Sequence, residues 1–274
     1  MPARLVSLLL ILALPASSRA GADLPLVDAH IHYNQDAWSV VSPTEAVKRL
    51  RQAGLKRALV SSTDDEGTQR LLAVAPDLII PELRPYRGPG DPGTWVRDES
   101  IVAYVEDRLR AHRYVGIGEF HVQGADVDLA VPRRLVQLAK QHGLMLHAHA
   151  DADAVERIFR QDPDARVIWA HAGMEAPDRV RGMLRRYRSL WADLARSDHV
   201  ADGKVVPEWR SLFMEFADRF MVGTDTHAPD IWRQVPGRAA WMRAWLADLP
   251  PDVAEHIAWK NGEAVLGAIA VKQP

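Results

Sequence analysis

The chain alternates short apolar runs with longer segments whose apolar residues recur at helical spacing. Each run is apolar nearly throughout and is bounded by turn-forming residues, which is the pattern of parallel strands covered on both faces. The predicted strands are 26–30, 55–61, 78–83, 114–120, 144–149, 167–171, 189–194 and 220–223.

The segments between these runs carry residues typical of helix ends. The segment SPTE at 42–45 is a capping box with proline at the first helical position, and Gly54 ends that helix. Pro132 begins another helix, which Gly143 ends. Further helices are predicted at 99–111, 153–160, 178–186 and 207–218.

Eight strands alternating with helices over about 250 residues is the arrangement of a TIM barrel. We therefore expect an α/β fold with a single (β/α)8 barrel over residues 23–274 and extra helices at its C-terminal end. A doubly wound open sheet is the main alternative. Its usual glycine pattern is missing, because Gly116 and Gly118 are followed by Phe120 and His121 rather than by a third glycine and a helix.

The first 22 residues have the pattern of a secretory signal peptide. A basic Arg4 precedes the apolar run LVSLLLILAL, and small residues suited to cleavage follow at 18–22. The alternative is a membrane anchor, but this run is shorter than the roughly 20 residues that span a bilayer. We therefore expect an exported product, periplasmic or secreted. Cleavage removes Arg4 and Arg19 from 34 basic residues, against 36 acidic ones, and leaves a net charge of −4.

The composition narrows the possible functions. Of 274 residues, 47% are hydrophobic and 26% charged, as in a soluble globular protein. The chain has no cysteine, which excludes disulfides, thiolate zinc sites and a cysteine nucleophile. Its slight negative charge gives no electrostatic reason to expect nucleic acid or an anionic membrane as partner. A small-molecule substrate is the expected partner.

The histidines gather at the ends of predicted strands, where a TIM barrel has its active site. Of eleven histidines, seven lie there: His30, His32, His121, His147, His149, His171 and His227. Glu119 and Asp225 also lie at strand ends. Imidazole nitrogens and carboxylates that converge in a barrel mouth are the ligands of a zinc-like divalent metal.

Each of these motifs alone also has a purely structural interpretation. The histidine pair of the first strand could bond carbonyls in the core, and Glu119 could form a barrel salt bridge. His171 could hold a loop, and Asp225 could cap the loop that follows it. Their joint arrangement on five strands favours a metal centre, because burying so many titratable groups without a metal is costly.

The sequence resembles the amidohydrolase superfamily, specifically its amidohydrolase-related branch, with features of TatD-like and phosphotriesterase-like relatives. The matching segments are VDAHIHY (27–33), GIGEFH (116–121), GLMLHAHAD (143–151), VIWAHAGM (167–174), MVGTDTH (221–227) and NGEAVLG (261–267). The resemblance implies a metal-dependent hydrolase on a distorted (β/α)8 barrel. It implies as metal ligands His30, His32, His149, His171 and Asp225.

Two features depart from the pattern of some relatives. No lysine ends the fourth strand; Glu119 stands in its place, as in the glutamate-bridged relatives, so one or two ions are possible. The fifth strand offers two histidines of equal parity, and we favour His149 as the ligand, with His147 one layer deeper. The expected ion is zinc, with Mn, Fe, Co or Ni as alternatives.

The mechanism that we expect is hydrolysis of an ester, lactone, amide or phosphoester by a metal-activated water. Asp225 would take the proton of the water and pass it to the leaving group, and His171 would bind a second ion or polarise the substrate. The candidate substrate contacts are His121, His147, Arg84, Arg87 and His227.

Two other functions remain open. A non-oxidative decarboxylase of the same branch needs a cation for the substrate carboxylate, which Arg84, Arg87 or His121 could supply. A catalytically inactive metal- or ligand-binding periplasmic protein would not need Asp225. A secreted deoxyribonuclease fits less well, because the chain has no basic stripe.

Two further segments carry aromatic residues. Segment 84–95 is too rich in Pro and Gly for regular structure, and it is either a lid with Tyr86, Arg87 and Trp95 facing substrate or a plain surface loop. The tryptophans of the C-terminal helices are expected to pack against the barrel; they are Trp232, Trp241, Trp245 and Trp259.

Overall fold

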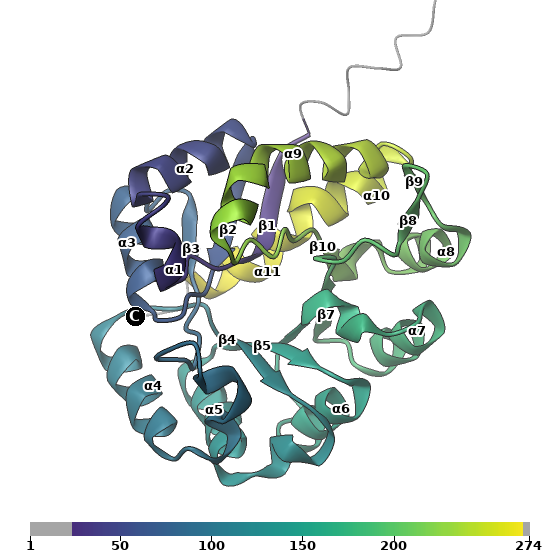
Figure 1. Ribbon diagram of the computed structural model, residues 1–274. Helices are drawn as coiled ribbons and strands as arrows, with labels where there is room; N and C mark the ends of the chain where they lie inside the picture. The colour runs from purple at the N-terminus through teal and green to yellow at the C-terminus, as the bar shows by residue number, and fades with distance from the viewer. Residues whose placement is uncertain (1–23, 271–274) are drawn as a thin grey trace, which may run out of the picture.

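The computed structural model describes residues 24–270, which form a ring of parallel strands surrounded by helices (Figure 1). All eight predicted strands are present, several of them shorter than expected. They are β1 (Leu26–Ile31), β2 (Leu55–Val60), β3 (Ile79–Pro81), β4 (Gly116–Val122), β5 (Met145–Ala150), β6 (Val167–Trp169), β7 (Leu190–Asp193) and β10 (Phe220–Met221). The expected signal peptide lies outside the described residues.

The strands pair in the order β1-β2-β3 and β10-β7-β6-β5-β4. Backbone hydrogen bonds join these two sheets at both edges. The amide of Leu83 donates to the carbonyl of Gly116 at 3.0 Å. At the other edge, the amide of Ala29 donates to the carbonyl of Val222 at 2.9 Å. The strands therefore form the closed ring of a TIM barrel, and the open-sheet alternative is wrong.

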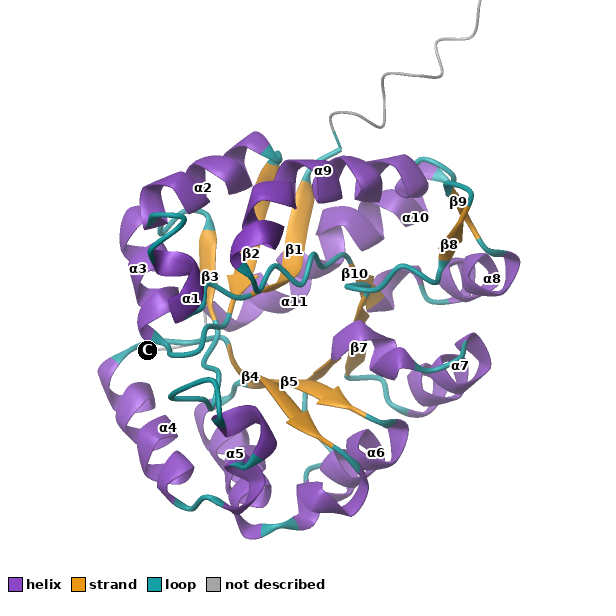
Figure 2. Cartoon of the chain, in the orientation of Figure 1, coloured by secondary structure: helices purple, strands orange, loops and turns teal. Residues whose placement is uncertain are grey.

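Helices cover the outside of this ring (Figure 2). They are α1 (Gln35–Trp38), α2 (Pro43–Gln52), α3 (Glu66–Val74), α4 (Ser100–Ala111), α5 (Ala130–His142), α6 (Ala152–Gln161), α7 (Pro177–Arg186), α8 (Pro207–Glu215), α9 (Pro229–Leu246), α10 (Pro251–Glu255) and α11 (Asn261–Ala270). Ser42 caps α2 through the amide of Glu45, as predicted, whereas α5 begins two residues before Pro132. A short hairpin of β8 (Val200–Ala201) and β9 (Lys204–Val205) was not predicted.

The apolar residues form two layers. A large cluster lies between the strands and the outer helices, and a smaller one fills the barrel interior, where Val27 and Met145 cluster with Val265 and Leu266 of α11. The polar residues at the strand ends are thereby left at the other end of the barrel. Among residues 24–270, no helix is long and apolar enough to cross a lipid bilayer.

The C-terminal tryptophans pack largely as expected. Trp232 and Trp245 are buried, and Trp259 is half-buried against both apolar clusters. Trp241 is the exception: 39% of it is exposed.

His199, before β8, is a buried histidine enclosed by aromatic rings. Its ring centroid lies 4.8 Å from that of Trp245 and about 6 Å from those of Trp209 and Phe213. Neither ring nitrogen has a hydrogen-bond partner among the described residues. Burial therefore lowers the pKa of His199 from 6.5 to about 4.

This histidine predicts a loss of stability in mild acid. As the pH falls from about 6.5 to about 4, the unfolded chain takes up a proton at His199 that the folded chain does not, so the free energy of unfolding decreases. Between pH 7 and pH 5, the titration of His199 should lower the free energy of unfolding by about 2 kcal/mol.

His199→Phe should lose less stability over that interval, because phenylalanine preserves the ring packing and does not titrate. Urea unfolding at the two pH values measures the difference, with exposed His142→Gln as control. If His199→Phe shows the same pH dependence as the wild type, His199 is not buried in its neutral form.

Candidate metal centre

The strand ends place most of the predicted residues around one cavity of about 240 Å³. Glu119 enters it because β4 has an irregular register there: Gly118 pairs with His147, and Phe120 already pairs with Ala148. Such bulges re-aim side chains beside active sites. Gly118 has φ +152°, and a Cβ at this position would lie 2.4 Å from the carbonyl oxygen of His147, so only glycine fits.

Three histidines have their Nδ1 atoms fixed by oxygen acceptors. The Nδ1 of His30 lies 3.2 Å from Asp193 Oδ2, that of His32 lies 2.5 Å from the Ser61 carbonyl, and that of His171 lies 2.8 Å from the Ala195 carbonyl. When Nδ1–H donates to oxygen, Nε2 carries the lone pair. The three rings therefore present Nε2 to the site, which is how metal-binding histidines are commonly oriented.

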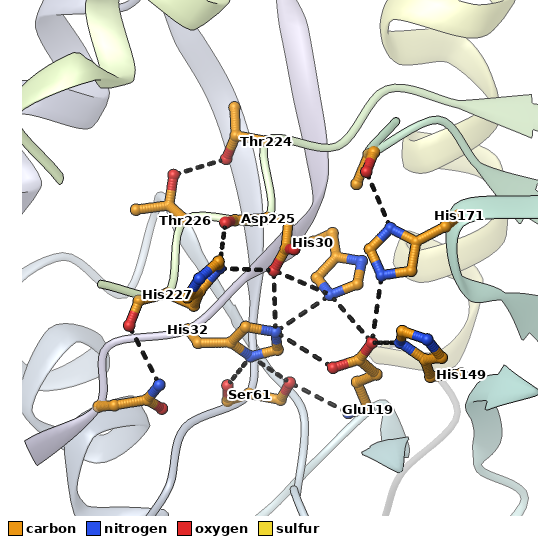
Figure 3. A network of polar contacts seen from close by, with 12 residues as sticks. His30, His32, Ser61, Glu119, His149, His171, Thr224, Asp225, Thr226 and His227 are labelled. Carbon is orange, nitrogen blue, oxygen red and sulfur yellow. Dashed lines mark hydrogen bonds and ion pairs between the residues drawn. The ribbon is translucent and has the colours of Figure 1, made fainter. Parts of the chain in front are cut away.

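One group of potential ligands consists of His30, His32 and Asp225. The Nε2 atoms of His30 and His32 are 3.0 Å apart, and Asp225 Oδ1 lies 3.7 and 3.6 Å from them, respectively (Figure 3). Burial and the charge of Arg84 lower the pKa of His32 to about 3, so this ring is neutral and able to bind a metal.

Glu119 connects this group to a second one. Its Oε1 lies 3.5 Å from the Nε2 atoms of both His30 and His171 and 2.9 Å from Nδ1 of His149 (Figure 3). Its Oε2 lies 3.4 Å from His32 Nε2 and 2.7 Å from Arg84 Nη2. The carboxylate therefore contacts His30 and His32 as well as His149 and His171, as a bridging group would. One of its oxygens also accepts a hydrogen bond from Arg84.

The electrostatics of these residues suit a cation. Burial alone would raise the pKa of Glu119, but His30, His149 and His171 lower it well below its usual value. Burial likewise opposes the ionised form of Asp225. The hydrogen bond with His227 and the charges of His30 and His32 nevertheless lower the pKa of Asp225. Burial opposes the charged form of His30, but Asp193 and Glu119 raise its pKa well above the usual value, so without an ion this ring carries a proton that a metal would replace. Carboxylates and imidazole nitrogens are the donor set of a divalent transition metal, and these residues fit such an ion.

Two of the candidate ligands lie in an unfavourable backbone conformation. His171 has φ 54° and Asp225 has φ 45°, in the left-handed region that costs a non-glycine residue about 1–2 kcal/mol. His171 also corrects our prediction for strand 167–171, because β6 ends at Trp169 and His171 lies in a tight turn over 170–174. Gly173 permits this turn, since a Cβ there would lie 2.2 Å from the Trp169 ring.

His147 lies deeper than His149, and its place in the list of substrate contacts is wrong. Its Nδ1 lies 3.1 Å from Glu82 Oε2 and its Nε2 lies 3.0 Å from Asp193 Oδ2. Burial would lower the pKa of His147, but these two carboxylates outweigh it and raise the pKa to about 9. The ring is a buried cation that holds two carboxylates, and it does not line the cavity.

Arg87 is also misplaced in our prediction, since it pairs with Asp91 and Asp98 on the surface and does not line the cavity. The other candidate contacts, Arg84, His121 and His227, do line it.

Segment 84–95 is not a lid with its aromatic rings facing the substrate. Tyr86 and Trp95 are buried. The Tyr86 hydroxyl accepts a hydrogen bond from the backbone amide of His121 at 2.8 Å, and Trp95 Nε1 donates one to the backbone carbonyl of His121 at 2.8 Å. The segment therefore holds His121 in position. It contains a short 3-10 turn at 91–93, and a second one, 95–97, begins at its last residue.

Several residues that support this site were not predicted from the sequence. Asp193 contacts the rings of His30 and His147 and accepts from the amides of His171 and Ala195. It ends a predicted strand, so the rule that selected the histidines could have found it, and the same holds for Glu82. Asn34 lines the cavity from the loop after β1, and no pattern in the sequence marks it.

The amidohydrolase family model matches residues 27–268. The fold is similar to that of an uncharacterized TIM-barrel protein from Bordetella bronchiseptica, with a TM-score of 0.60, 13% identity, and coverage of 90% of this chain and 100% of that one. It is also similar to a proposed 2-pyrone-4,6-dicarboxylic acid hydrolase from Pseudomonas putida, with a TM-score of 0.59, 14% identity, and coverage of 89% and 98%.

A TatD homologue from Escherichia coli gives a TM-score of 0.58 at 16% identity, with coverage of 88% of this chain and 97% of that one. No curated protein matches the sequence at a significant level. At these identities the structural matches bear on the fold alone.

Proposed function

This chain belongs to the amidohydrolase family, and we propose that within it the protein is a metal-dependent hydrolase of a small ester, lactone, amide or phosphoester. The observation that carries the proposal is the convergence of six potential ligands: five of them line one cavity, and the sixth, His30, lies 3.7 Å from Asp225. We propose as metal ligands His30, His32, Glu119, His149, His171 and Asp225.

When bound, a divalent ion supplies Lewis-acid activation of water and of the scissile carbonyl or phosphoryl group. The chain supplies the proton acceptor. The lowered pKa of Asp225 keeps its carboxylate ionised at neutral pH, and its side chain is 30% exposed toward the cavity. We infer that Asp225 takes a proton from water and returns it to the leaving group. His227, 3.2 Å away, holds the carboxylate in place.

The decarboxylase alternative is less well supported by the geometry. It needs a cation that is free to bind a substrate carboxylate. The Arg84 guanidinium is bonded to Glu119, and Arg87 is paired with Asp91 and Asp98 and does not line the cavity. The remaining candidate, His121, is buried enough to lower its pKa to about 4, so it is neutral.

A panel of esters, lactones, amides, phosphoesters and aromatic carboxylic acids, assayed with the metal-loaded protein, tests this proposal. Hydrolysis of a member of the first four classes is expected. Release of CO2 without hydrolysis would replace the proposal with the decarboxylase, and inactivity on every class would favour the binding protein.

The position of Glu119 predicts a site for two ions, because a bridging anion offsets the repulsion between dications about 3.5–4 Å apart. Calorimetric titration of the apoprotein should give two equivalents of metal, falling to one in Glu119→Gln. The exposed Glu208→Gln serves as control. One equivalent in both wild type and Glu119→Gln would mean that Glu119 only orients the ligands by hydrogen bonds.

We propose that the protein is exported and that residues 1–22 are removed. Expression of the full chain in a bacterial host should yield a periplasmic or secreted product. N-terminal sequencing of that product should begin after Ala20 or Ala22. A product that retains residues 1–22 and sediments with membranes would indicate the anchor instead.

A further inference from the structure

A second cleft, of about 670 Å³, lies beside the metal centre and shares no lining residue with its cavity. Its walls come from the loop after β7, the segment after β10 and one face of α9. The residues of α9 that line it recur every three to four positions, from Arg233 through Gly237 and Arg238 to Trp241, so they form one continuous stripe on the helix.

The cleft carries a positive charge that is only partly compensated. Three arginines and no carboxylate are among its described lining residues. Arg196 is paired with Asp198, but Arg233 is exposed and has no ion-pair or hydrogen-bond partner in the part of the chain described. Arg238 donates to the Thr224 carbonyl at 2.9 Å, while its buried Nε has no partner there.

The same cleft has an apolar side. Trp241, 39% exposed, and Met242 line it next to the arginines. An exposed indole ring beside guanidinium groups suits a molecule with a flat apolar body and a negatively charged end, because the ring provides contact area and arginine binds carboxylates in a bidentate manner.

The cleft also touches the backbone that supports the metal centre. Arg196 donates to the carbonyl of His171 at 2.9 Å, and Thr224, which Arg238 contacts, directly precedes Asp225. A molecule in the cleft would therefore lie against two segments that position the candidate ligands.

We propose that this cleft is a binding site for the carboxylate of a small organic anion with a planar apolar body, with Arg233 and Arg238 as its cationic contacts and Trp241 as its wall. The proposed anion site does not depend on hydrolysis. The cleft could fail to bind an anion while the metal centre is active, and it could bind one while the protein shows no hydrolase activity.

Isothermal titration of the purified, metal-loaded protein with benzoate tests it, with benzamide as the uncharged analogue. Benzoate should bind and benzamide should bind at least about tenfold more weakly. Arg233→Glu should weaken benzoate binding at least about tenfold. Arg110→Glu, the same charge change at an exposed position on α4, should leave it unchanged.

A second variant blocks the cleft without altering its charge. A Cβ at Gly237 would meet no atom within 4 Å, so the backbone there has room for the side chain that Gly237→Leu adds to the stripe. Leucine also favours helix more than glycine, so the melting temperature should not fall. This variant should likewise weaken benzoate binding at least about tenfold.

Three results would overturn the proposal. Benzoate binding that Arg233→Glu and Gly237→Leu leave intact would place the anion elsewhere, including at the metal. Equal binding of benzamide would remove the role of charge. Failure of benzoate to bind, with phenyl phosphate binding in a manner that depends on Arg233, would assign the cleft to phosphate esters instead of carboxylates.

Discussion

Replacing Asp225 by asparagine is expected to reduce kcat by about 10²–10⁴-fold while the metal content stays near that of the wild type. Asparagine has the same shape and keeps one oxygen for a ligand, but it cannot accept a proton. The Nε2 atoms of His30 and His32, 3.0 Å apart, remain available to the ion. The loss should therefore fall on the chemical step.

The measurement is kcat on a substrate found in the panel, together with elemental analysis of the same preparation. Asp230→Asn, at an exposed position at the start of α9, is the matched control and should retain full activity. Activity of Asp225→Asn within about threefold of the wild type would refute the proton-transfer role.

Replacing His30 and His32 together by alanine is expected to abolish both metal binding and activity. The two rings supply two nitrogen donors from one strand. Without them, Asp225 is the only residue left of the potential ligand group formed by His30, His32 and Asp225. The wild type, purified without chelators, should carry Zn, Mn, Fe, Co or Ni. The double variant should hold less than about one tenth of an equivalent.

Thermal unfolding of the two proteins, each with and without added metal, gives a second readout. Metal should raise the melting temperature of the wild type alone, because a ligand stabilises the state that binds it. His142→Ala, exposed at the end of α5, controls for loss of a surface histidine. A double variant that still takes up a full equivalent would exclude this pair as ligands.

The barrel was predictable because the physics of its strands is local. A parallel strand covered on both faces must be apolar along its length, so runs such as 220–223 mark it without reference to other residues. The rule that active-site groups lie at strand ends then selected His32, Glu119 and Asp225, which do line one cavity.

What the sequence could not reveal depends on contacts between distant residues. The burial of His147 between Glu82 and Asp193 requires three strands to be in place. Tyr86 turns inward because His121, 35 residues later, offers it an amide. The arginine-lined cleft likewise appears only when α9 packs beside the loop after β7.

The position of Asp193 limits how this site can be re-engineered. One carboxylate holds the ring of His30 and that of His147, and it accepts two backbone amides from the loops after β6 and β7. A designer who replaced His30 with aspartate to favour a harder ion would bring two carboxylates into contact in the interior. Changing the metal preference would therefore require coordinated replacement of His30 and Asp193, and a search through single substitutions would miss the combination.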